Sequence, residues 1–135
     1  MKRILTAIFI AMAAISASSC TDKGALQGEW IIRSVGDMMI QDAEASPSLT
    51  FNIETGRIHG YTGVNIVNGE FEREGRKLSL KGLGVTMMAG PEEDMDLERR
   101  ILDSFNNVTH AKISPEGELQ FFNSERDTIM ILVRR

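Results

Sequence analysis

Few side chains in this sequence have the type and spacing that chemistry requires. The chain has 135 residues, among them two histidines and one cysteine. A catalytic zinc site usually takes three protein ligands, whereas His59 and His110 lie in separate strand-like segments without the His-Glu-x-x-His spacing of a zinc protease. The Gly-x-Ser-x-Gly motif of a serine hydrolase is also missing from the sequence. The sequence therefore favours a non-enzymatic protein, with no catalytic residue, metal or cofactor.

The cysteine stands where a lipid would be attached. Residues 1–3 are a short cationic start, and residues 4–15 form an apolar run with one polar residue. This run is shorter than the roughly 20 apolar residues that span a bilayer, and its length is typical of a secretory signal peptide. Residues 16–19 are small and Cys20 follows directly, which resembles a bacterial lipoprotein signal. Ala17 is a mild departure, because that position usually holds a larger aliphatic residue.

This pattern divides the chain into three expected segments. Residues 1–19 are the lipoprotein signal peptide, residues 20–27 a lipidated tether, and residues 28–135 the folded domain. The alternative is an ordinary secreted protein with a spare thiol. Lipidation is favoured because the single cysteine falls at the position that lipidation would use. Each buried CH₂ of an acyl chain contributes about 0.8 kcal/mol, so a lipid on Cys20 would keep the protein at a membrane.

Composition and charge exclude other classes of protein. Hydrophobic residues make up 42% of the chain and charged residues 25%, which is too apolar for a disordered chain and too mixed for an integral membrane protein. The 19 acidic residues exceed the 15 basic ones, which argues against nucleic acid as a partner. We expect one domain, and a monomer.

Most of the body alternates apolar and polar residues with the period of a β-strand. The strand candidates are residues 29–35, 49–53, 57–61, 69–73, 77–80, 118–121 and 128–133. Glycine-containing turns between them favour antiparallel pairing, and the last strand, apolar at both parities, should be central or covered on both faces. Residues 92–106 have apolar residues three and four apart, which predicts one amphipathic helix. The expected fold is α+β and mainly β, a curved antiparallel sheet or partly open β-barrel with one helix packed on it.

Three pieces of the sequence occur in a characteristic order. They are Gly28-Glu29-Trp30, then Gly63-Val64-Asn65 with Asn68-Gly69 after it, then Thr86-Met87-Met88-Ala89-Gly90-Pro91 with a helix carrying Met95, Glu98, Ile101 and Phe105. This order resembles the META domain family, which includes the HslJ-like heat-shock lipoproteins. The resemblance implies a mainly β domain in the cell envelope, in the outer membrane of a Gram-negative bacterium, linked to heat shock and stress response. The family has no accepted enzymatic activity.

This chain departs from the family pattern at two positions. Val64 and Gly90 stand where the family commonly has cysteines, so no thiol or redox role is carried over. Gly63, Asn65 and Gly69 are candidates for a recognition loop. Glycine and asparagine also supply turns, and we favour that structural interpretation.

The methionine-rich motif admits two interpretations. Thr86, Met87 and Met88 either line an apolar groove together with Met95, since methionine adapts to varied ligands, or fill the gap between sheet and helix, which we favour. Trp30 is interpreted as a core anchor.

Three functions are open at this point. The first is an envelope interaction module that engages a protein or surface component. The second is a carrier for an apolar ligand between helix and sheet, and the third and weakest is an envelope enzyme.

Overall fold

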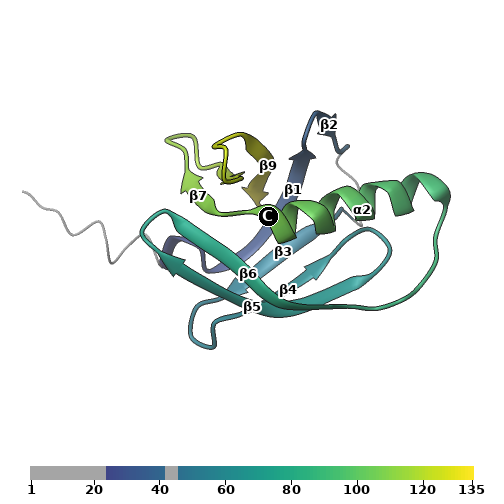
Figure 1. Ribbon diagram of the computed structural model, residues 1–135, viewed down its shortest axis with the longest axis horizontal. Helices are drawn as coiled ribbons and strands as arrows, with labels where there is room; N and C mark the ends of the chain where they lie inside the picture. Colours follow the sequence, from purple (N-terminus) through teal and green to yellow (C-terminus); the bar gives the residue numbers. More distant parts are fainter. Residues whose placement is uncertain (1–23, 42–45) are drawn as a thin grey trace, which may run out of the picture.

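The computed structural model of the protein describes residues 24–41 and 46–135 (Figure 1). The expected signal peptide and Cys20 lie outside the described residues. The elements are β1 (Gly28–Val35), β2 (Met38–Met39), β3 (Ser48–Asn52), β4 (Arg57–Tyr61), β5 (Ile66–Glu74), β6 (Lys77–Val85), α2 (Glu92–Asn107), β7 (His110–Ile113), β8 (Leu119–Phe122) and β9 (Thr128–Arg134).

The strands form one antiparallel sheet that closes into a ring. The strand order is β2-β1-β3-β4-β5-β6-β7-β8-β9, and β9 pairs back onto β1 from Trp30↔Arg134 to Val35↔Met130. The short β2 only extends β1 as a hairpin. The expected mainly β fold with a barrel-like sheet and one packed helix is confirmed, and the structure adds the pairing that joins the first long strand to the last.

The ring of strands is least tightly paired between β6 and β7. These strands share a single residue pair, Lys77↔His110. Helix α2 packs against β6 and β1, and it runs from the centre of Figure 1 to the right-hand side. The buried side chains of Ile101 and Phe105 on α2 join the core, as the helical spacing predicts.

The first turn of the described chain belongs to the core. Leu26 is fully buried, and its carbonyl accepts a 2.9 Å hydrogen bond from Trp30 Nε1. The guanidinium of Arg134 lies 4.1 Å from the Trp30 ring centroid and donates to the carbonyls of Ala25 and Gln27. The folded unit therefore includes Leu26, inside the segment expected to be a tether. Trp30 is 1% exposed, as expected for a core anchor.

The last strand is central because it is hydrogen-bonded to β1 on one edge and β8 on the other. Met130 and Leu132 are buried, while Ile129, Ile131 and Val133 on the other face are half-buried. The prediction of a central strand is therefore confirmed, with only one face in the core. In the part of the chain that the structure describes, no helix has the length and hydropathy needed to cross a membrane.

A bulge bends the long β5–β6 hairpin. The register shifts between Asn68 and Glu70, and Gly82 on the facing strand has a φ of +58°. A Cβ on Gly69 would lie 2.8 Å from the Lys81 carbonyl oxygen, so a larger residue would clash with backbone. Gly69 thus has a steric role in the sheet, in agreement with the structural interpretation.

Candidate functional site

The side chain of Asn65 binds a distant loop through both of its polar atoms. Its Oδ1 accepts hydrogen bonds from Thr86 Oγ1 and the Met88 N–H, each at 2.7 Å. Its Nδ2 donates to the Met88 carbonyl at 3.0 Å and to Glu98 Oε1 at 2.8 Å. Asn65 is 2% exposed, and satisfying both ends of a buried amide is what its desolvation requires.

Glu98 completes this cluster from the buried face of α2. It is 6% exposed, and its Oε1 also accepts a 2.8 Å hydrogen bond from Thr62 Oγ1. The same hydroxyl accepts from the Asn65 N–H at 2.9 Å. Three separate segments are therefore joined by one hydrogen-bonded group, the Asn65 cluster, which consists of Thr62, Asn65, Thr86, Met88 and Glu98.

Glu98 was part of the sequence pattern but was not proposed as a site residue. It lies three residues before Ile101 and seven before Phe105, so it shares their face of the helix. An acidic residue on the apolar face of an amphipathic helix is the signal that could have identified it.

The prediction that Met87 and Met88 fill the gap between sheet and helix is wrong. Their exposed fractions are 95% and 64%. The hydrogen bonds from Asn65 draw the main chain of Met88 toward the barrel, which leaves the methionine side chains outside. We call residues 86–90 the methionine loop. Ile66, 42% exposed, adjoins it, since its carbonyl accepts from the Thr86 N–H.

Two glycines shape this end of the molecule. Gly63 has a φ of +104°, and its carbonyl accepts a 3.0 Å hydrogen bond from the Tyr61 hydroxyl. A Cβ on Gly90 would lie 3.1 Å from Val64 Cγ2. The two positions where the family commonly has cysteines, 64 and 90, are therefore close neighbours in space.

Met95, the third methionine of the predicted apolar groove, is half-buried on α2.

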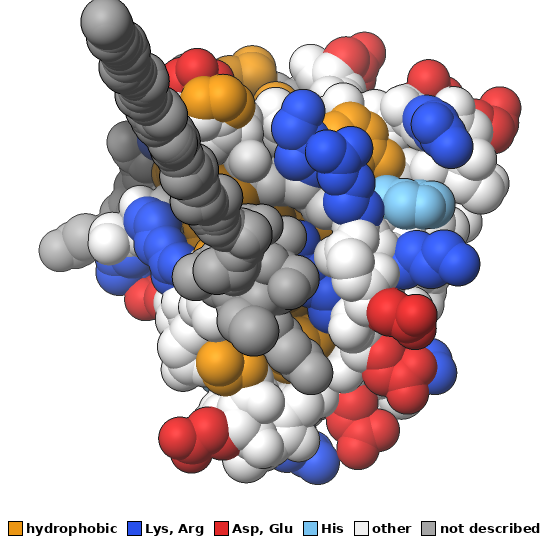
Figure 2. Space-filling view, turned by 90° about the vertical axis from the view of Figure 1, so that its left-hand side faces the viewer, with side chains coloured by type: hydrophobic (Ala, Val, Ile, Leu, Met, Phe, Trp, Pro, Cys, Tyr) orange, Lys and Arg blue, Asp and Glu red, His pale blue; other side chains and the backbone are white. Residues whose placement is uncertain are grey.

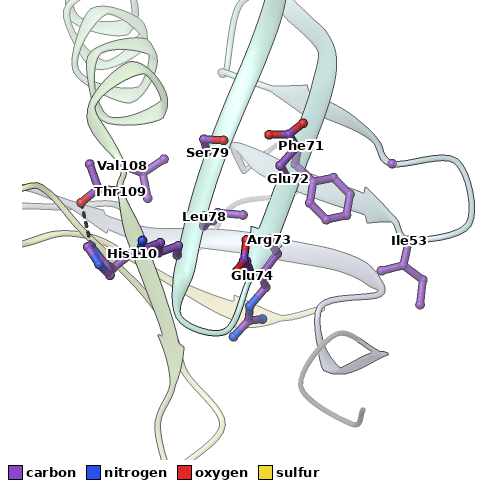
Figure 3. Close-up of a pocket in the computed structure, with 12 residues that line it drawn as sticks. Ile53, Phe71, Glu72, Arg73, Glu74, Leu78, Ser79, Val108, Thr109 and His110 are labelled. Atoms are coloured by element: carbon purple, nitrogen blue, oxygen red, sulfur yellow. Dashed lines mark hydrogen bonds between the residues drawn. The ribbon is translucent and has the colours of Figure 1, made fainter. Parts of the chain in front are cut away.

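A second candidate site, which sequence reasoning missed, is a groove of about 810 Å³ beside the turn of the β5–β6 hairpin (Figure 3). We call it the hairpin groove. Its lining residues are Ile53, Gly56, Phe71, Glu72, Arg73, Glu74, Lys77, Leu78, Ser79, Val108, Thr109 and His110. They come from the β3–β4 turn, both strands of the hairpin and the α2–β7 junction, and this dispersion along the chain leaves no local sequence signal.

The polar groups of the groove are partly paired. Glu72 forms a 2.6 Å ion pair with Lys81, and Arg73 Nε donates to the Gly75 carbonyl at 2.9 Å. The dashed line in Figure 3 marks the 2.9 Å hydrogen bond between Thr109 Oγ1 and His110 Nδ1.

The groove and the methionine loop lie at opposite ends of the long axis in Figure 1. The groove is at the end where the described chain begins, and Gln27 Oε1 accepts a 2.9 Å hydrogen bond from the N–H of Ile53, a lining residue. Figure 2 views this end and shows basic side chains gathered around a histidine, with acidic side chains grouped below them.

The histidines lie on different parts of the sheet. The Nδ1 of His59 shares a 2.9 Å hydrogen bond with Asn68 Oδ1 on the neighbouring strand, whereas His110 borders the groove. Within residues 24–41 and 46–135, no three His, Cys, Asp or Glu side chains gather as metal ligands would.

Comparisons with known proteins give a consistent result. The pattern of the META domain matches residues 24–135. An NMR structure of a protein from Burkholderia xenovorans aligns with a TM-score of 0.64 at 20% identity, covering 96% of this chain and 95% of that one. A crystal structure of a DUF4847 family protein from Bacteroides vulgatus aligns with a TM-score of 0.61 at 10% identity, covering 85% and 97%. These likenesses show the fold. No curated protein matches the sequence.

Proposed function

This chain belongs to the META domain family, and from that premise we propose that it is a non-enzymatic interaction module of the bacterial envelope that binds a protein through the methionine loop. The module would be held at the outer membrane by a lipid on Cys20 and would serve envelope integrity under stress.

The exposure of Met87 and Met88 on a fixed main chain is the observation that carries this proposal. Loops that expose large apolar side chains usually mark interaction sites when those side chains form a patch, and Ile66 beside the loop enlarges this one. The Asn65 cluster fixes the loop through both backbone groups of Met88. A fixed loop loses little conformational entropy on binding, which favours affinity.

The position of the loop also supports a protein partner. The methionine loop lies at the end of the molecule opposite the start of the described chain (Figure 1). If Cys20 carries a lipid, the loop points away from the membrane and toward components that approach from the aqueous side.

Site-specific photocrosslinking in whole envelopes tests this function. A photoreactive amino acid at position 87 should give a discrete protein adduct, whereas the same residue at Glu116, exposed in the β7–β8 turn, should not. The adduct should weaken in an Asn65→Ala background, because the loop is then no longer fixed. Identical adducts from both positions, or none from position 87, would contradict the proposal.

The lipid anchor has a separate test. Cys20→Ala should abolish incorporation of labelled fatty acid into the protein and release it from the membrane fraction. Cys20 is the only cysteine of the chain, so fatty-acid labelling that continues in the Cys20→Ala variant would have to be at another kind of residue and would rule out this anchor.

The hairpin groove favours a second candidate function, that of a carrier for an apolar ligand. Its volume of about 810 Å³ is within the range of small-molecule sites, roughly 300–1,000 Å³. Its lining does not include Met87, Met88 or Met95, so a ligand in this groove would not lie where the sequence placed it.

A further inference from the structure

The methionines of this protein differ widely in their contact with water. Met130 on β9 is 1% exposed and belongs to the core. Met87 and Met88 in the methionine loop are 95% and 64% exposed, and Met39 on β2 is 69% exposed. An oxidant dissolved in water therefore meets the side chains of the loop long before it meets the core methionine.

The main chain beneath the two exposed side chains is held in place. Both backbone groups of Met88 are hydrogen-bonded to the Asn65 side chain, and Thr86 Oγ1 donates to the same amide at 2.7 Å. None of these bonds uses a methionine sulfur, and neither Met87 nor Met88 packs against the hydrophobic core. A chemical change at either sulfur thus alters the surface of the loop without removing a contact that fixes it.

The thioether sulfur of methionine reacts with peroxides. Its lone pair attacks one oxygen of hydrogen peroxide, the O–O bond breaks, and the second oxygen leaves as water after a proton has moved to it. One thioether and one hydrogen peroxide give one sulfoxide and one water, so the sulfur loses the two electrons that the peroxide gains. The product is a polar side chain in place of an apolar one, and sulfoxide reductases reverse the change.

We propose that Met87 and Met88 form a reversible oxidation site, where a peroxide turns the apolar surface of the methionine loop into a polar one and weakens binding of the protein partner. The effect on binding rests on the proposed function, whereas the oxidation does not. Met39 supplies an internal comparison, because it is an exposed methionine outside the loop.

A time course of oxidation tests the site without a partner. The full-length protein is extracted from membranes in detergent, treated with hydrogen peroxide and digested for peptide mass spectrometry. Sulfoxide should form first at Met87, then at Met88 and Met39, and last at Met130. The rates should converge in urea, which removes the differences in exposure. Oxidation of Met130 as fast as that of Met87 in the native protein, or none at Met87, would overturn the proposal.

The stability of the oxidised protein provides a second readout. Since the sulfur atoms of the loop hold no contact in the core, protein oxidised at Met87 and Met88 with Met130 intact should unfold at the same temperature as the untreated protein. A lower melting temperature would overturn the proposal, because oxidation would then act by disturbing the fold and not by changing the surface.

Leucine variants test the consequence for binding. A photoreactive amino acid at position 66, beside the loop, should give a protein adduct in untreated envelopes. Peroxide should lower its yield about tenfold, since burial of one methionine side chain contributes at least that factor to affinity. The double variant Met87→Leu, Met88→Leu keeps apolar side chains that peroxide does not oxidise, so its adduct should persist. Met39→Leu retains both loop methionines, and its adduct should be lost as in the native chain.

Repair of the sulfoxide completes the experiment. Treatment of oxidised envelopes with methionine sulfoxide reductase should restore the adduct of the native chain. An adduct that peroxide does not reduce, or that is lost equally in the double leucine variant, would overturn the proposal. If untreated envelopes give no adduct from position 66 or position 87, the proposed function fails instead, and the time course still decides the oxidation site.

Discussion

The two ends of the barrel are packed in different ways, one around polar side chains and the other around apolar ones. At the loop end, polar groups from three segments meet in the Asn65 cluster and satisfy one another. At the groove end, apolar side chains such as Phe71 and Leu78 border an open space of about 810 Å³, because β6 and β7 share only one residue pair.

The difference shows how one small domain combines rigidity and openness. A buried polar group is costly unless it is hydrogen-bonded, so a satisfied cluster fixes the backbone around it. Apolar packing is less directional, so the apolar side chains around the groove constrain the neighbouring backbone less. We therefore expect the loop end to respond sharply to the loss of single polar atoms.

The largest loss of stability is expected for Asn65→Ala, at the loop end of the barrel. This change removes four side-chain hydrogen bonds and leaves the buried carboxylate of Glu98 and the part-buried backbone groups of Met88 with fewer partners. Each such group typically costs about 1–3 kcal/mol, so the free energy of unfolding should fall by about 3 kcal/mol or more in urea denaturation. The control is Asn68→Ala, an exposed asparagine bonded to His59, which should cost under about 0.5 kcal/mol. Similar losses in both variants would contradict the role given to the cluster.

The β5–β6 hairpin links the two ends, and Gly69→Ala tests its geometry. The new Cβ would meet the Lys81 carbonyl oxygen at 2.8 Å, and such overpacking typically costs about 1–3 kcal/mol. Gly84→Ala on the facing strand is the matched variant, because its Cβ would lie 4.0 Å from the nearest atom, the Asn68 carbonyl oxygen. Thermal unfolding should separate the two variants clearly, and equal melting temperatures would argue against a steric requirement at Gly69.

A smaller effect is expected where α2 begins, next to the methionine loop. Glu92, Glu93 and Asp94 lie in the first turn, where the helix dipole favours acids by about 0.3–1 kcal/mol. Glu93→Ala should therefore lower the free energy of unfolding only slightly, and less so at high salt. A large loss, or one that salt does not reduce, would indicate a further role for this carboxylate.

The smallest effect on stability is expected at the methionine loop itself. Met87 is 95% exposed, so Met87→Ser should leave the free energy of unfolding within about 0.5 kcal/mol of the native value. The same variant should weaken partner binding, measured by pull-down from envelopes. Binding that is unchanged in Met87→Ser would contradict the role given to the methionine loop.

Local structure follows from local sequence in most of this chain. The alternation of Leu49 and Phe51 predicted strand β3 and the face that is buried. The three- and four-residue spacing of Ile101 and Phe105 predicted α2. These patterns are local because the periods of strand and helix determine which side chains share a face.

The candidate sites were less accessible to sequence reasoning. Met87 is apolar, and its residue type fits a core as well as a surface, so only the hydrogen bonds from Asn65, 23 residues before Met88, decided its exposure. The hairpin groove depends on where β6 diverges from β7, and no residue type in the sequence indicates that position.

The sequence by itself therefore determined the family, most of the strands, the helix and Trp30 as a core residue, because each follows from short-range periodicity or from a motif. The tertiary structure alone decided the closure of β9 onto β1, the burial of Glu98 and the exposure of the methionines. These features depend on contacts between segments tens of residues apart, whose free energies appear only once the sheet has brought the segments together.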